Sequence, residues 1–190
     1  MKKPASTSVS IHPLLNERWS PRAFDASHQI AEEDITAILE AGRWAPSANN
    51  NQPWRFIVAR KGDSHFESLK SKLMGFNQSW VPDASLFIVV NAITKNAEGS
   101  TIFTALYDAG LAAGLMTVEA THRGLAVHQV GGYDRAAVKA EYGMDDSMQT
   151  IAILVIGKQA PAESLGDETL RTREVADRVR KPLEELILNR

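Results

Sequence analysis

The sequence contains no cysteine among its 190 residues. This absence excludes disulfide frameworks, zinc–thiolate sites, iron–sulfur clusters and cysteine nucleophiles. A marked excess of one charge is also missing, because 21 basic and 23 acidic side chains give a formal net charge of −2. The charge balance therefore offers no global electrostatic reason to expect a nucleic acid or an anionic membrane surface as a partner.

Long apolar runs are missing too, since no stretch approaches the roughly 18 apolar residues that a membrane-spanning helix needs. The start of the chain carries lysines but no apolar segment behind them, which predicts an ordinary tail and not a secretion signal. We therefore expect a cytoplasmic protein. The length fits one domain over residues 1–190, with an N-terminal tail at 1–13 and a C-terminal arm at 170–190.

What the sequence does contain is an alternation of helical and strand-like segments. Apolar residues at helical spacing predict helices over residues 31–44, 65–75, 102–122 and 135–142. Runs rich in branched and aromatic side chains predict strands over residues 54–59, 86–90, 125–130 and 151–156. That order predicts an α+β fold in which helices flank a mixed central β-sheet on both faces.

The segment over residues 102–122 is the longest predicted helix, and it is apolar nearly all round. A helix of this kind is expected to be buried. It is longer than so small a sheet can cover, so part of it is expected to pack against a second copy of the chain. Gly110, Ala113 and Gly114 would let another backbone or a flat ligand approach closely.

Arg18, Ser20 and Arg22 lie within five residues of one another just before the first predicted helix. Guanidinium groups supply rigid paired donors that suit phosphate, and a nearby helix N-terminus would favour an anion further. The alternative is a solvated basic turn. Residues 178–182 form another basic cluster, for which ordinary surface charge is the alternative.

Residues 45–54 form a polar loop between a predicted helix and a predicted strand. Its Asn and Gln side chains offer paired donors and acceptors that match the edge of a flavin or nucleobase ring. The alternative is a turn-rich connector, because Asn, Pro and Ser favour turns for backbone reasons. Gly131 and Gly132 end a predicted strand, where they would let N–H groups approach a planar ligand or would form a plain turn.

In combination and in this order, these segments resemble the nitroreductase family. The resemblance rests on RWSPRAF at residues 18–24, WAPSANN at 44–50, QPWRF at 52–56, FN at 76–77, DAS at 83–85, VGGYD at 130–134 and RVR at 178–180. It spans about residues 14–186, and its most specific part lies between residues 44 and 56. The resemblance implies a three-layer fold that binds FMN and an intertwined homodimer with FMN at the subunit interface.

Carried over by position, the resemblance implies that Arg18 and Ser20 hold the FMN phosphate. Arg178 and Arg180 would join them from the C-terminal arm. Trp19 belongs to the same cofactor-binding motif, although arginine or histidine is common at its place in the family.

The flavin ring has its own set of implied partners. Arg22 would lie at the N1/C2 carbonyl edge, where a fixed positive charge favours the anionic hydroquinone. Asn77 would bind the pyrimidine edge. Val130 precedes the two glycines of the site: the Gly131 N–H would point at N5, and Gly132 would contact O4.

Ser47, Asn49, Asn50 and Gln52 are the implied cofactor-binding residues of the polar loop. The first three would reach the flavin from the other subunit, so each site would straddle the dimer interface. Trp80 is a departure from the family, because some members place a lysine beside the flavin there. The tryptophan is expected to weaken the charge near the ring and to alter substrate stacking.

The implied reaction is a ping-pong cycle: NADH or NADPH gives a hydride to flavin N5, and an electron-poor acceptor such as a nitroaromatic or a quinone is then reduced. The alternatives are a specialised dehalogenase, dehydrogenase or flavin-breakdown enzyme of the same fold, a non-catalytic FMN-binding protein, and a domain without a cofactor. Neither a P-loop nor a GxGxxG motif occurs, so the nucleotide is expected to bind over the flavin. No metal site is expected, and His122 and His128 are expected to have ordinary structural roles.

Overall fold

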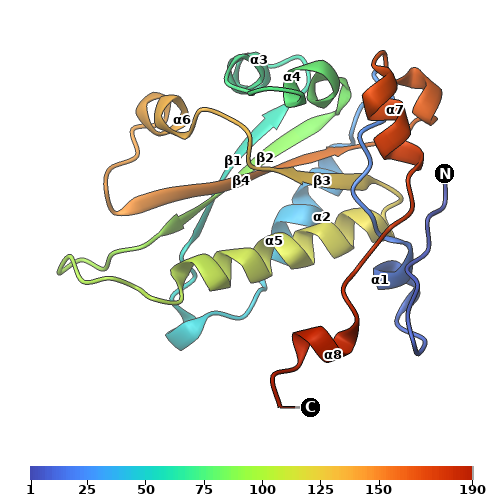
Figure 1. Ribbon diagram of the computed structural model, residues 1–190. Helices are drawn as coiled ribbons and strands as arrows, with labels where there is room; N and C mark the ends of the chain where they lie inside the picture. The colour runs from blue at the N-terminus through green and yellow to red at the C-terminus, as the bar shows by residue number, and fades with distance from the viewer. Residues whose placement is uncertain (190) are drawn as a thin grey trace.

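The computed structural model describes residues 1–189, which fold around one four-stranded sheet (Figure 1). The strands are β1 (Trp54–Arg60), β2 (Leu86–Ile93), β3 (Ala126–Val130) and β4 (Met148–Gly157), in the spatial order β1-β2-β4-β3. The helices are α1 (Pro13–Glu17), α2 (Glu32–Arg43), α3 (Ser64–Ser71), α4 (Asn77–Trp80), α5 (Ala105–His122), α6 (Arg135–Glu141), α7 (Glu168–Val175) and α8 (Leu183–Leu186). Short 3₁₀ turns lie at η1 (Ala48–Asn50), η2 (Val81–Asp83) and η3 (Ala162–Ser164).

The α+β arrangement is confirmed, but the expectation of a mixed sheet is wrong for the described strands. All three strand pairs, β1 with β2, β2 with β4 and β3 with β4, are antiparallel. Helices between strands suggested parallel crossovers, yet a helical connection can return the chain to either end of a sheet. Here α3 and α4 return it to the end it left, because Arg60 at the end of β1 pairs with Leu86 at the start of β2.

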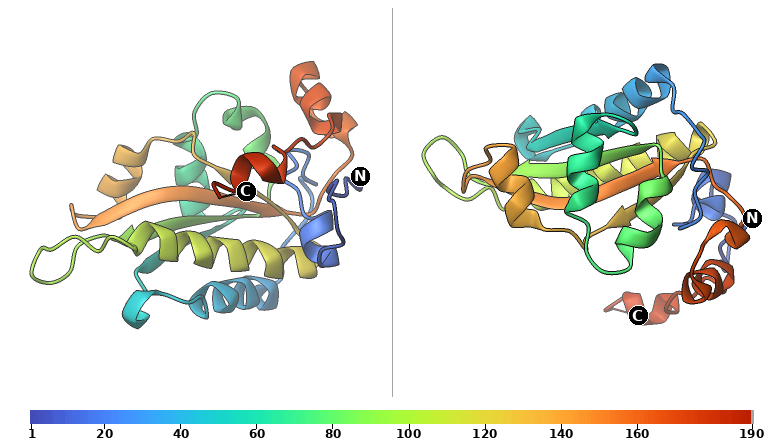
Figure 2. Two further views of the ribbon diagram at one scale, coloured as in Figure 1. Left: turned by 60° about the horizontal axis from the view of Figure 1, so that its bottom comes forward. Right: turned by 90° about the horizontal axis from the view of Figure 1, so that it is seen from above.

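The sheet is covered on both faces, as the apolar strands predict. Figure 2 shows α2 and α5 on one face and α3, α4 and α6 on the other. Along β2, Leu86, Ile88 and Val90 belong to the core cluster under α2 and α5. Phe87 and Val89 belong to the cluster on the opposite face. Side chains of a strand alternate between faces, so a strand buried on both sides is apolar along most of its length, and in β2 only Asn91 is polar.

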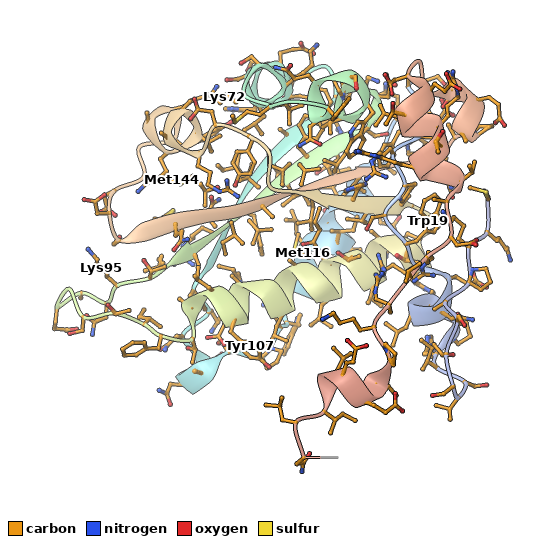
Figure 3. All side chains as sticks on the ribbon, in the orientation of Figure 1. Trp19, Lys72, Lys95, Tyr107, Met116 and Met144 are labelled. Atoms are coloured by element: carbon orange, nitrogen blue, oxygen red, sulfur yellow. The ribbon has the colours of Figure 1, made fainter. Side chains whose placement is uncertain are left out.

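Helices α2 and α5 approach each other closely at Gly42. A Cβ atom at this position would lie 2.8 Å from the Cγ and Sδ atoms of Met116 and 3.3 Å from the Phe56 ring. Met116 is fully buried between the two helices and the sheet (Figure 3). The glycine therefore sets how near α2 comes to α5, and a larger residue would push the helices apart.

The prediction that the long helix is buried is only half right. Its sheet-facing side is built from small residues such as Ala109 and Ala112, which are fully buried. On the other side Leu106, Tyr107 and Leu115 are exposed, and Tyr107 points away from the sheet in Figure 3. A helix that is apolar nearly all round has no polar side to turn toward water. The side that the protomer does not cover therefore exposes apolar residues. Among residues 1–189, no helix combines the length and apolar character that crossing a membrane requires.

Candidate functional site

Several of the predicted cofactor residues lie beside β3, which is an edge strand of the sheet. Arg18 and Trp19 line a cavity of about 180 Å³ together with Leu125 and Ala126, where the strand begins. Pro21 contacts His128 in the middle of the strand. The glycine pair comes directly after the strand ends. The Arg18–Trp19 pair, the Pro21 peptide and the glycine pair therefore lie one after another beside β3. Together they span about 20 Å, at roughly 3.3 Å per residue of the strand.

A cluster of arginines lies at the first of these places. The Arg18 side chain is half-buried, and its Nη1 atom lies 3.5 Å from the Ser20 hydroxyl. Burial lowers the pKa of Arg18, and the nearby charges of Arg178 and Arg180 lower it further. Within the described residues none of the three guanidinium groups forms an ion pair with a carboxylate. Like charges gathered without a counter-charge favour an anion between them.

Arg178 also ties the two ends of the chain together. Its Nη1 atom donates to the carbonyl oxygens of Lys3 at 2.6 Å and of Asn16 at 2.9 Å. Lys3 in turn places its ammonium 4.5 Å from the centroid of the Trp19 ring. The N-terminal segment thus lies against the basic cluster, to which the C-terminal arm contributes Arg178.

The peptide around Arg22 is held from two sides. The Glu174 carboxylate accepts the N–H of Arg22 at 2.8 Å and that of Ala23 at 3.2 Å. The Nδ1 atom of His128 lies 2.9 Å from the Pro21 carbonyl oxygen, to which it donates. Burial lowers the pKa of His128 from 6.5 to about 4, so the ring is neutral near pH 7. The two contacts fix the backbone on both sides of Arg22.

The Arg22 guanidinium itself is partly buried. Burial lowers its pKa, the charge of Glu174 raises it, and the charge of Arg173 lowers it. Glu174 therefore acts on Arg22 through the backbone and also through its charge. Arg173 extends the site outward, since its guanidinium lies 5.5 Å from the centroid of the exposed Phe76 ring.

Trp80 is buried in the core behind His128, with ring centroids 4.6 Å apart, and stacks on Phe24 at 6.2 Å. Only 1% of its surface is exposed. The expectation that it alters substrate stacking is therefore wrong for this protomer, because a ring buried in the core cannot also face a bound substrate. Its contact instead supports the ring of His128.

The glycine pair and Asn77 meet beyond the end of β3. The Gly132 carbonyl oxygen accepts the Met74 N–H at 2.9 Å and the Asn77 side-chain amide at 3.1 Å. A Cβ atom at Gly132 would lie 2.7 Å from the Asn77 Nδ2 atom, so a larger residue would displace the Asn77 amide. The N–H groups of Gly131 and Gly132 have no acceptor among the turn, loop and side-chain hydrogen bonds of the described residues. Val130, just before them, is buried.

The polar loop lies elsewhere. In Figures 1 and 2 it sits at the N-terminal end of α5, whereas α1, which leads into Arg18, lies at the opposite end. Asn49, Asn50 and Gln52 adopt left-handed φ angles of 51°, 55° and 46°. The Ser47 hydroxyl accepts the Gln52 N–H at 3.0 Å. No hydrogen bond within residues 1–189 joins this loop to the other predicted site residues.

Three residues that contact the site were not singled out as site residues by the sequence. Asp108 on α5 is buried, and its carboxylate accepts the Ala48 N–H at 3.3 Å. Glu174 and His128 hold the Arg22 segment. Glu174 is one of several charged residues in α7, and no periodicity or motif of the sequence marks it. Only the alternation in β3, which turns His128 to the face opposite Val127, was available as a signal.

The sequence model of the nitroreductase family matches residues 15–74 and 61–158, which together make up well over half of the chain. The chain belongs to the nitroreductase family. This confirms the resemblance on which the predicted site rests.

Solved structures place the nitroreductase fold on nearly the whole chain. An oxidoreductase containing FMN superposes with a TM-score of 0.89 at 32% identity, covering 97% of this chain and 93% of its own. A Desulfovibrio desulfuricans protein, provisionally described as a nitroreductase and solved with FMN, superposes with a TM-score of 0.73 at 26% identity, covering 95% and 98%. The Bacillus subtilis protein YdgI, provisionally named an NAD(P)H nitroreductase, is 28% identical over 77% of this chain and 87% of its own. The helix-flanked nitroreductase-like fold is thereby confirmed.

Proposed function

We propose that this nitroreductase-family protein is an FMN-dependent oxidoreductase that transfers electrons from NADH or NADPH to an electron-poor acceptor. Family membership supports the class of reaction. Two related proteins of known structure contain FMN, and a related protein carries an NAD(P)H nitroreductase name. Nitroaromatic compounds and quinones are the acceptor classes that we expect.

The observation that carries the proposal is the order of groups along β3. An unneutralised arginine cluster lies at the start of the strand, and unused backbone N–H groups lie past its end. FMN has a phosphate at one end and a ring with hydrogen-bond acceptors at the other, so the residues present fit the cofactor. Arg18, Ser20, Arg178 and Arg180 would hold the phosphate, with Trp19 beside them.

The ring would lie toward the far end of β3. Arg22 would supply a fixed positive charge at its N1/O2 edge, and Asn77 would bind the pyrimidine edge. The Gly131 N–H would donate to N5, with Gly132 at O4. When bound, FMN supplies the two-electron chemistry, while the protein positions the ring and controls which molecules reach it. Donor and acceptor would bind in turn over the same ring face, which is the basis for a ping-pong order.

We further propose a homodimer with the site at its interface. The exposed apolar side of α5 gives a second copy a surface to cover. Gly110 and Gly114 lie on that side, and a Cβ atom at either would meet nothing within 4 Å in the protomer. Ser47, Asn49 and Asn50 would then reach the partner's flavin, which explains why their loop lies far from the protomer's own arginine cluster.

The first test is the visible spectrum of the purified protein, followed by titration with FMN. We expect flavin absorption bands or quenching of FMN fluorescence on binding. Colourless protein that also leaves added FMN unbound would refute the proposal. Steady oxidation of NADH or NADPH with a quinone or a nitroaromatic acceptor is the second expected result. FMN-bound protein that oxidises neither nucleotide would favour the non-catalytic alternative.

A further inference from the structure

Among residues 1–189, Glu174 is the buried carboxylate that reaches the Arg22 segment from the C-terminal part of the chain. Only 1% of its surface is exposed, and both of its oxygens accept consecutive backbone N–H groups, those of Arg22 and Ala23. A carboxylate can accept on both oxygens, whereas an amide of the same shape would turn a donor toward one of these N–H groups. The geometry therefore requires the charged side chain at this place.

The same residue connects three parts of the chain. Glu174 lies in α7, and its backbone carbonyl oxygen accepts the Lys3 ammonium at 2.9 Å. The ammonium also contacts the carbonyl of Ala176. The N-terminal tail, the start of the C-terminal arm and the Arg22 segment thus meet at one residue, through the backbone carbonyl and the carboxylate of Glu174.

We infer that Glu174 is a positioning residue, which fixes the Arg22 peptide and partly offsets the positive charge that Arg22 presents to the flavin. This inference rests on the proposed FMN site. The opposing influences of Glu174 and Arg173 on the pKa of Arg22 show that both charges act at this guanidinium. The C-terminal arm, which also supplies the proposed phosphate ligands, would then control the reduction potential of the bound flavin.

Two substitutions test the charge of Glu174 and its reach. Glu174→Gln keeps the length of the side chain and one of its two acceptor oxygens, and it removes the charge. With less to offset Arg22, reduced FMN should gain affinity relative to oxidised FMN by about tenfold, a positive potential shift of about 30 mV for a two-electron couple. Glu174→Asp keeps the charge but shortens the side chain. It should weaken FMN binding by about tenfold and leave the potential unshifted.

The measurements are FMN dissociation constants by fluorescence and midpoint potentials by dye equilibration, neither of which depends on turnover. Glu168→Gln, an exposed acid on the same helix, is the matched control and should change neither quantity. A Glu174→Gln protein that binds FMN at the wild-type potential would overturn the charge role. A Glu174→Asp protein with wild-type FMN affinity would overturn the positioning role. Failure of the wild-type protein to bind FMN would instead refute the proposed function.

Discussion

At the C-terminal end of α5, the Arg18–Arg22 segment is held by His128 and Glu174, which come from distant parts of its own chain. Arg178 holds Asn16, just before this segment. At the N-terminal end, the polar loop is held by its own Ser47 hydroxyl, by the Asp108 carboxylate and by the Ile93 N–H at Pro53. The first region thus makes its contacts within one protomer. The second region has left-handed φ angles at Asn49, Asn50 and Gln52, and no hydrogen bond within residues 1–189 joins it to the other predicted site residues. Backbone strain gathers at functional sites, which fits the proposed role of this loop at the subunit interface.

The largest expected effect comes from disrupting the proposed dimer, in which the polar loop of one protomer would reach the arginine-lined site of the other. Leu115→Glu places a carboxylate on the exposed side of α5, where burial by a second copy would leave the charge unpaired. Such burial costs several kcal/mol, so we expect the dimer to be lost and FMN binding to fall with it. Size-exclusion chromatography with light scattering measures the first effect. Leu15→Glu, at a similarly exposed leucine on α1, is the control. A Leu115→Glu protein that remains dimeric would show that α5 is not the interface.

The next effect concerns the stability that the buried ring of His128 gives to the region of the Arg18–Arg22 segment. Because burial lowers the pKa of His128 from 6.5 to about 4, the unfolded chain takes up a proton in this range that the folded chain does not. Stability should therefore fall as the pH drops from 6.5 to about 4, by about 3 kcal/mol in total.

Urea unfolding at pH 7 and at pH 4.5 measures this loss. His128→Asn keeps a donor for the Pro21 carbonyl but has no titrating group, so it should lose less stability over the same interval. His122→Asn, at an exposed histidine, should behave as wild type. Equal pH dependence in the wild type and in His128→Asn would contradict the buried neutral ring.

A smaller effect distinguishes arginines within the basic cluster. Arg18→Ala should weaken FMN binding about thirtyfold, equivalent to about 2 kcal/mol, with little loss of stability. Arg178→Ala should weaken FMN binding and also stability, because the Arg178 guanidinium ties residues 3 and 16 to the C-terminal arm. Arg43→Ala, an exposed arginine on α2, is the control for both measurements. Equal stability losses in Arg18→Ala and Arg178→Ala would remove this distinction.

The fold was predictable wherever the signal is local. Each predicted strand and helix lies within a few residues of the observed one, because apolar periodicity follows directly from the buried face of an element. Strand direction was not predictable in this way, since α3 and α4 can return the chain to either end of the sheet. The burial of α5 was misjudged for a related reason: composition shows that a face is apolar but not which molecule covers it.

The candidate site likewise contains residues that the sequence indicated and residues that it did not. Family motifs indicated that Arg18 and Arg178 act together, and the structure places their charges close enough to influence each other. Glu174 had no such signal, because its importance comes from two backbone N–H groups more than 150 residues earlier in the chain, as its separations of 152 and 151 residues show. Contacts between a side chain and a distant backbone leave no pattern in one sequence.

The smallest expected effect concerns the strained loop at the N-terminal end of α5. Asn49 has a φ angle of 51°, whereas its neighbour Asn51 has a φ angle of −67°. Asn49→Ala should therefore cost about 1 kcal/mol of unfolding free energy, and Asn51→Ala should cost much less. Asn49→Gly should be close to neutral for stability, because glycine tolerates the left-handed region. If the Asn49 side chain reaches the partner's flavin, Asn49→Gly will still weaken FMN binding. Unchanged FMN affinity in Asn49→Gly would mean that the strain only shapes the backbone of the loop.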